Sequence, residues 1–322
     1  MSSSFKNQTI TTTIRSNKMK KALLALLSIA IAFTALSPAQ AEDQKVLAII
    51  DSAINSKNFP SIIHEVCFTK IKSSIPAQNM SCPNGELFME GPGAASAPWP
   101  LQVDSKTKLP VPGLFSLNNA TFHGDTMVKA ALTVNPNLKI VFIRFNDVTS
   151  LGNSRGDADA LASAINWVSQ NASKYSIDAL SISQGSVAAG NLSRCLTDTT
   201  TINAISSLNL NNVPVFVAVG NDRRKDVVAF PSCVNGAIGV GALGNATQLE
   251  GLTNTGPGLD MVAPGKVRVT KYNGSPTDTA GSSVATAVSA ASYVNRNTFK
   301  TFGEYLASLP KILIGTTSYI RN

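Results

Sequence analysis

Three residues that lie far apart in the sequence have types suited to nucleophilic chemistry. Ser283 lies in AGSSVATA, where a glycine and two serines precede a run of small apolar residues typical of a buried helix. A serine hydroxyl needs a base within hydrogen-bond reach and a third group that fixes the tautomer of that base. Of the two histidines, His123 begins a predicted helix, whereas His64 lies in the apolar stretch PSIIHEVC. With Asp51 at the end of a predicted strand, the order Asp, His, Ser predicts acyl transfer.

Each of these residues also has a structural interpretation. The adjacent hydroxyls of Ser282 and Ser283 could cap the helix that they begin, because the first N–H groups of a helix lack intrahelical partners. A single histidine at a helix start is most often a cap or a surface residue. The shared order of the three residues favours chemistry over capping.

Four apolar, β-branched runs and four helical patterns must position these side chains. The runs are 45–50, 139–145, 177–183 and 213–219, and the helical patterns are 123–134, 156–172, 200–211 and 283–296. Such alternation predicts an α/β fold with a mostly parallel sheet buried on both faces. Polar residues cluster where three of the strands end, at the sheet edge that collects functional groups. They are Asp51, Ser52, Ser183, Gln184, Gly185, Gly220, Asn221 and Asp222.

Six motifs in register resemble those of the subtilase family of subtilisin-like serine peptidases, from about Val46 to Val294. They are VLAIIDSAI, FHGDTMVKAAL, ALSISQGS, VPVFVAVGND, LDMVAPG and AGSSVATA. The resemblance implies a three-layer fold with a doubly wound sheet flanked by helices. It makes Ser283 the nucleophile, His123 the general base and acid, and Asp51 the group that orients the imidazole. Asn221 would complete an oxyanion hole, and Ser282 would be a structural hydroxyl.

The implied activity is that of an exported serine endopeptidase that forms an acyl-enzyme and needs no cofactor. An extended polypeptide substrate would add to exposed backbone, with side chains of medium size and apolar character at the cleavage position. The predicted substrate-binding residues are Ser183, Gln184, Gly185, Gly220 and Ala229. By the same resemblance, the Phe230–Pro231 bond is expected to be cis.

The motifs depart from the family pattern at two places. Asp125 and Thr126 replace the last two residues of HGTH, and Ala287 replaces a proline four residues after Ser283. These changes motivate an alternative, a catalytically impaired subtilase-fold protein that binds peptides. An α/β-hydrolase is excluded because it requires a GxSxG elbow and the chain order Ser, Asp, His.

The first 41 residues have the pattern of a secretory signal peptide, with lysines before an apolar run and a small-x-small ending at Ala39 and Ala41. Met19 is an alternative start, which would leave 1–18 upstream. Cleavage after Ala41 leaves 22 basic and 19 acidic residues, a net charge of +3. A net charge this small gives no indication of nucleic-acid binding. A secreted or periplasmic location is expected, with no membrane anchor after cleavage.

The predicted peptidase domain, 42–322, contains a long Pro-, Gly- and Ser-rich insertion at about 67–119. No propeptide domain is evident, because Asp51 follows Ala41 by ten residues. A separate activator or chaperone is therefore a candidate partner.

All four cysteines lie in the exported part, where pairing is expected. Of three connectivities, we favour Cys67 with Cys82 and Cys195 with Cys233. Zinc lacks support because no CxxC spacing is present. Structural calcium is an expectation without an assigned site, since Asp147, Asp157 and Asp159 are candidate ligands outside any evident calcium loop.

Overall fold

A computed structural model describes residues 45–70, 81–96, 101–103, 106, 110–115, 123–148, 154–270, 275–296, 301–314 and 317–322. The predicted signal peptide and parts of the predicted insertion at 67–119 lie outside these residues. The described chain from Lys45 onward forms one compact unit.

A ten-stranded sheet forms the centre of this unit, in the order β15-β16-β12-β11-β10-β9-β1-β6-β2-β3. The strands are β1 (Val46–Asp51), β2 (Ile62–Phe68), β3 (Phe88–Glu90), β6 (Lys139–Arg144), β9 (Ile177–Ile182), β10 (Val215–Ala218), β11 (Ala237–Leu243), β12 (Met261–Pro264), β15 (Lys311–Ile314) and β16 (Thr317–Arg321). Every pairing is parallel except those of the two edge strands, β3 with β2 and β15 with β16. The predicted mostly parallel sheet is confirmed.

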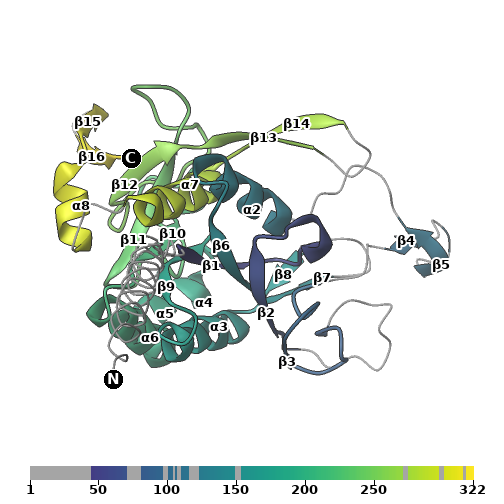
Figure 1. Cartoon of the computed structure of the whole chain (residues 1–322). Coiled ribbons are helices and arrows are strands. Elements are labelled where there is room, and N and C mark those ends of the chain that lie inside the picture. Colours follow the sequence, from purple (N-terminus) through teal and green to yellow (C-terminus); the bar gives the residue numbers. More distant parts are fainter. Residues whose placement is uncertain are drawn as a thin grey trace, which may run out of the picture. The chain divides into compact units, whose positions relative to one another are not determined.

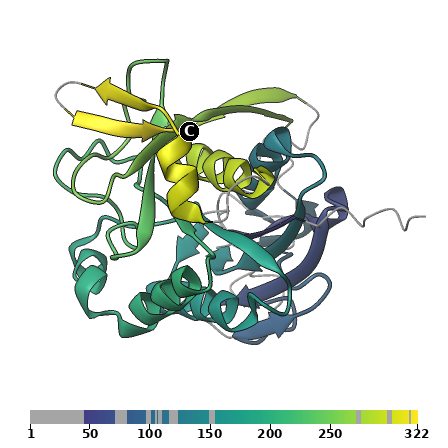
Figure 2. The same ribbon diagram turned by 60° about the vertical axis from the view of Figure 1, so that its left-hand side comes forward.

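Helices cover both faces of the sheet (Figure 1). They are α2 (His123–Val134), α3 (Ala158–Asn171), α4 (Ala189–Leu192), α5 (Arg194–Thr197), α6 (Thr199–Leu210), α7 (Ser282–Asn295) and α8 (Phe302–Ser308), with a 3-10 turn at Ser56–Asn58. One face packs against α2, α7 and α8, and the other against α3 and α6, as the turned view also shows (Figure 2). Three two-stranded sheets complete the described elements: β4 (Leu101–Val103) with β5 (Pro110–Phe115), β7 (Asn146–Val148) with β8 (Ser154–Gly156), and β13 (Lys266–Thr270) with β14 (Pro276–Ala280).

The alternation of side chains along β1 explains why its sequence is apolar from Val46 to Ile50. Leu47 and Ile49 enter the core under α2 and α7, whereas Val46, Ala48 and Ile50 enter the core under α3. All five are at most 2% exposed. Burial on both faces requires apolar residues at every position, which is the pattern of a central parallel strand.

Small residues let α7 approach the sheet closely. Ala285, Ala287, Ala290 and Ala291 are fully buried in the core that α7 shares with α2. Ala287, which stands where the family pattern has proline, therefore packs as part of the helix core.

Both predicted disulfides are present. Cys67 is bonded to Cys82 with a Cα–Cα distance of 5.8 Å, and Cys195 to Cys233 with one of 5.6 Å. None of the described helices combines the length and the apolar character that a membrane span requires.

Candidate active site

Asp51 and His123 meet at the carboxyl end of β1. The Nδ1 atom of His123 lies 2.8 Å from Oδ1 and 3.0 Å from Oδ2 of Asp51. The Asp51 side chain is fully buried, and the backbone N–H of Ser52 donates to its Oδ1 at 2.6 Å. The Ser52 hydroxyl in turn accepts the N–H of Gly124 at 3.1 Å, which fixes the first turn of α2 against the end of β1.

Gly124 makes this approach sterically feasible. A Cβ at this position would lie 2.7 Å from the ring of Phe142 and 2.8 Å from the carbonyl oxygen of Ala53. The glycine next to His123 is therefore required for the close contact of α2 with the sheet.

The carboxylate of Asp51 controls the charge of the imidazole. The His123 side chain is 36% exposed. Its partial burial acts to lower its pKa, but the negative charge of Asp51 and the hydrogen bond to it outweigh this effect and raise the pKa above its ordinary value.

Ser283 lies in the first turn of α7, and its partner is the end of β9. The Ser283 hydroxyl donates to the carbonyl oxygen of Ser183 at 2.9 Å, and the Ser183 hydroxyl donates to the carbonyl oxygen of Ser283 at 2.9 Å. Because a hydroxyl has a single proton, the proton of Ser283 points to β9 in this arrangement and not to His123.

Gln184 lies between the Asp51–His123 pair and the Ser183–Ser283 pair, because it follows Ser183 in the chain and its side chain contacts His123. Its Nε2 atom lies 2.9 Å from Nδ1 of His123 and 3.3 Å from Oδ1 of Asp51. The sequence predicts Gln184 as a wall of the substrate site and gives no sign of its contact with the imidazole. Neighbouring contacts thus run from Asp51 through His123, Gln184 and Ser183 to Ser283.

Asn221 lies against the N-terminus of α7. Its Oδ1 accepts the N–H of Ser282 at 2.9 Å, and a Cβ on Gly281 would lie 3.0 Å from its Nδ2. Gly281 has a φ of +141°, a backbone conformation that favours glycine. The fully buried hydroxyl of Ser282 accepts the N–H of Gly220 at 3.2 Å, so it holds the loop after β10 to α7.

Asn254 organises the same loop and is missed by the sequence analysis. Its fully buried Oδ1 end accepts the N–H groups of Asp222 at 2.8 Å and Arg224 at 3.0 Å. Its Nδ2 donates to the carbonyl oxygen of Val219 at 3.0 Å and to Oδ2 of Asp222 at 2.9 Å. In the sequence, Asn254 lies in the stretch LTNTGPG, where an asparagine signals only a turn.

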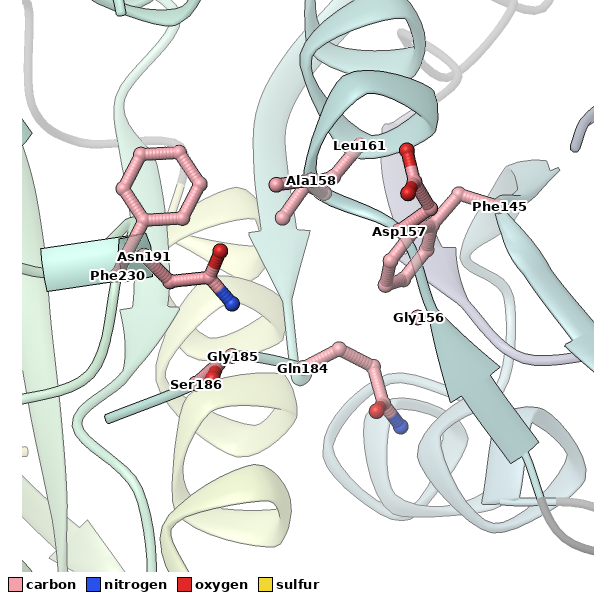
Figure 3. Close-up of a pocket in the computed structure, with 10 residues that line it drawn as sticks. All are labelled: Phe145, Gly156, Asp157, Ala158, Leu161, Gln184, Gly185, Ser186, Asn191 and Phe230. Atoms are coloured by element: carbon pink, nitrogen blue, oxygen red, sulfur yellow. The ribbon is translucent and has the colours of Figure 1, made fainter. Parts of the chain in front are cut away.

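A cavity of about 280 Å³ lies beside the carboxyl end of β9 (Figure 3). It is lined by Phe145, Gly156, Asp157, Ala158, Leu161, Gln184, Gly185, Ser186, Asn191 and Phe230. Ser186 and Phe230 exchange two backbone hydrogen bonds at 3.0 and 3.1 Å, which closes one side. A Cβ on Gly185 would lie 2.7 Å from the carbonyl oxygen of Phe230.

The five predicted substrate-binding residues divide into two groups. Gln184 and Gly185 line the cavity. Ser183 contacts Ser283, Gly220 contacts Ser282, and Ala229 is buried with its N–H bonded to Val219. The Phe230–Pro231 bond next to Ala229 is cis, as expected.

Asp125 lies within the first turn of α2, one of the positions where the histidine motif departs from the family. Its carboxylate is buried and accepts the N–H of Asn55 at 2.9 Å. Burial raises the pKa of Asp125 to about 6, against the opposing effects of the Asn55 hydrogen bond and the charge of Lys129.

The candidate calcium ligands on α3 are engaged by basic side chains. Asp157 caps the helix and lies 3.1 Å from the Lys70 ammonium, and Asp159 lies 2.6 Å from the Arg194 guanidinium. The side chain of Asp147 lies outside the described residues. Within the described chain, no three His, Cys, Asp or Glu side chains are grouped as a metal site.

His64, the other histidine, belongs to a different cluster. Its Nε2 lies 2.9 Å from both Glu90 Oε1 and the Tyr175 hydroxyl, and its ring stacks on Tyr175 at 4.4 Å between centroids. The choice of His123 over His64 as the partner of Asp51 agrees with this arrangement.

The sequence model of the subtilase family matches residues 117–298, more than half of the chain. The chain therefore belongs to the subtilase family of subtilisin-like serine peptidases. The matched range includes His123, Asn221 and Ser283, while Asp51 precedes it.

Named relatives and solved structures agree with this assignment. The chain is 32% identical over 137 residues to the Extracellular serine proteinase of Thermus sp. (strain Rt41A), a match that covers 42% of this chain and 31% of that protein. It therefore spans less than a third of this relative's length. A lanthipeptide protease has the same fold with a TM-score of 0.53 at 15% identity, covering 77% of this chain and 71% of the other. Proteases from Pseudoalteromonas arctica align with a TM-score of 0.53 at 20% identity, covering 77% of this chain and 75% of the other.

Proposed function

We propose that this protein is an exported serine endopeptidase with Asp51, His123 and Ser283 as its triad and Asn221 in its oxyanion hole. The observation that carries the proposal is the 2.8 Å contact between Nδ1 of His123 and the fully buried carboxylate of Asp51. A proton on Nδ1 that is held by Asp51 leaves Nε2 with the lone pair that a general base requires.

In the proposed reaction, the Ser283 hydroxyl leaves the Ser183 carbonyl and gives its proton to Nε2 of His123. Its oxygen attacks the carbonyl carbon of the peptide bond. The imidazolium, stabilised by Asp51, then gives the proton to the leaving amine, and Ser283 is acylated. Water attacks the acyl group with His123 again as base, and the acid product is released.

The N-terminus of α7 and Asn221 would stabilise the oxyanion. The Oδ1 of Asn221 is engaged by the N–H of Ser282, which leaves its Nδ2 as the end that donates. The first turn of α7 adds unpaired N–H groups and the positive end of the helix dipole.

The proposed substrate is an extended polypeptide that lies along Ser183, Gln184 and Gly185, with a side chain in the cavity that Gln184 and Gly185 line. Both disulfides support export, and the Thermus relative is named as extracellular. Secretion or a periplasmic location, the signal peptide at 1–41 and a separate folding partner or activator stay predictions. The chemistry needs no cofactor.

The alternative is a peptide-binding protein with an impaired site. It is motivated by the hydroxyl of Ser283, which donates to Ser183, and by the changed residues Asp125 and Ala287. All four proposed reactive groups are retained, which favours the peptidase.

A fluorophosphonate probe tests the proposal on the full disulfide-bonded protein. We expect covalent labelling of the wild type, loss of labelling in Ser283→Ala, and normal labelling of Ser308→Ala, a matched hydroxyl removal in α8. Casein cleavage should be lost in Ser283→Ala and His123→Ala. A wild type that is folded by circular dichroism but unlabelled would contradict the peptidase and support the peptide-binding alternative.

A further inference from the structure

The carboxylate of Asp51 is shared by more donors than the triad requires. Oδ1 faces the N–H of Ser52 at 2.6 Å, Nδ1 of His123 at 2.8 Å and Nε2 of Gln184 at 3.3 Å. Since Asp51 is fully buried, these protein groups and not water molecules satisfy its carboxylate oxygens.

The Gln184 amide also lies directly against the imidazole, with its Nε2 at 2.9 Å from Nδ1 of His123. A ring nitrogen carries either one hydrogen or one lone pair. When Nδ1 carries a hydrogen, that hydrogen goes to Asp51, and the amide N–H beside it goes to Oδ1 of Asp51. When Nδ1 carries a lone pair, the amide N–H can donate to it. In both states the positive end of the amide dipole is next to the ring, which disfavours the positively charged imidazolium.

Among the residues that the structure describes, Asp51 is the charged group found in contact with the His123 ring. Asp125 on α2, the other carboxylate near His123, directs its oxygen to the N–H of Asn55. The start of α7 contributes the neutral hydroxyl of Ser283.

We propose that Gln184 is a positioning residue for the His123–Asp51 pair: its side-chain amide shares the Asp51 carboxylate with the imidazole and keeps the ring neutral and able to accept a proton. A fully buried carboxylate at 2.8 Å would otherwise hold the ring protonated over a wider pH range. Gln184 therefore sets the acid limit of the working pH range. This role rests on the proposed peptidase function.

The same side chain faces the substrate cavity. Its stem lines the cavity, while its amide is turned away from Leu161, Asn191 and Phe230 (Figure 3). Asn191 lines the cavity as well. Because its amide is not among the contacts of the imidazole, a substitution of Asn191 serves as the control for a substitution of Gln184.

The test is a proton NMR titration of the imidazole resonances, which is simple because the chain has two histidines. Gln184→Met keeps the length of the side chain and removes the amide. We expect it to raise the titration midpoint of His123 by about one pH unit, the size expected for one lost hydrogen bond to a charged group. Gln184→Glu should raise the midpoint further, because it adds a negative charge. Asn191→Leu should leave the His123 midpoint unchanged, and His64 should be unaffected in all variants.

Kinetics provide a second readout, because the acid limb of kcat/KM reports the ionisation of the free enzyme. The limb should move to higher pH in Gln184→Met by the same amount as the NMR midpoint, whatever the height of the plateau, because Gln184 also lines the substrate cavity. An unchanged or lower midpoint in a folded Gln184→Met, or an acid limb that does not move, would overturn the proposal. If the wild type turns over no substrate, the proposed function fails, and the NMR titration still decides the role of Gln184.

Discussion

Asp125→Asn is expected to make the protein more stable above pH 6. Asp125 is 4% exposed, and burial raises the pKa of its carboxyl from 3.8 to about 6. The folded state therefore binds this proton more tightly than the unfolded state does. The resulting stability is present below the unfolded pKa near 3.8 and is lost as the pH rises to the folded pKa near 6.

The size of the effect follows from the same two values. One pH unit in pKa is worth about 1.4 kcal/mol. Compared with a side chain that never ionises, Asp125 therefore lowers the free energy of unfolding by about 3 kcal/mol at pH 8. At pH 4.5 the reduction is about 1 kcal/mol, because the unfolded state is mostly ionised while most native molecules still carry the proton. Asparagine is never charged, and its side-chain oxygen can still accept the N–H of Asn55.

Urea unfolding at pH 4.5 and pH 8, with both disulfides intact, measures this difference. The free energy of unfolding of Asp125→Asn should exceed that of the wild type by about 3 kcal/mol at pH 8 and by about 1 kcal/mol at pH 4.5. The control is Asp226→Asn, because Asp226 is exposed and its hydrogen bond to Arg224 lowers its pKa, so the effect should be opposite in sign and smaller. Equal stabilisation at both pH values, or destabilisation at pH 8, would refute the reasoning.

Two further substitutions test the proposed oxyanion hole and the buried amide that holds the loop after β10. Asn221→Ala should lower kcat for a peptide substrate by about 10²- to 10³-fold with little change in stability, a magnitude taken from the corresponding donor in subtilisin, the family's type member. A kcat within threefold of the wild type would remove Asn221 from the oxyanion hole. Asn254→Ala should lower the free energy of unfolding by about 2–4 kcal/mol, because it leaves buried N–H and carbonyl groups without partners, and urea unfolding at pH 7 measures this. A loss below 0.5 kcal/mol would show that water replaces the amide.

The framework of the fold could be predicted because it rests on repeated patterns. The central strands β1, β6, β9 and β10 are mainly apolar, and their observed bounds lie within two residues of the predicted ones. The start of α2 at His123 was predicted, and the ends of these strands place Asp51 and Ser183 on one edge. The edge strands β3 and β15 were not predicted, because short runs with partly exposed side chains carry no clear period.

Two features of the site have no counterpart in the sequence. The contact of Gln184 with His123 depends on a side-chain rotamer, which the packing of β9 against β1 and α7 influences. The hydrogen bonds of Asn254 reach back about 30 residues to the loop after β10, and nothing in a turn sequence specifies such a partner. Residue type and order were enough to propose Asp51, His123 and Ser283, whereas the groups that contact them required coordinates.

The alanine-rich helix α7 ties the proposed nucleophile, Ser283, to the packing of the core. Its first turn carries Ser283, and its buried face, with Ala285 and Ala287, packs with α2 in the main core. A methyl group added along this face would shift the helix and move the serine with it. Engineering for heat resistance should therefore leave α7 untouched and begin at the exposed β15–β16 hairpin, where Leu313 is 68% exposed and a polar replacement would remove no buried core contact.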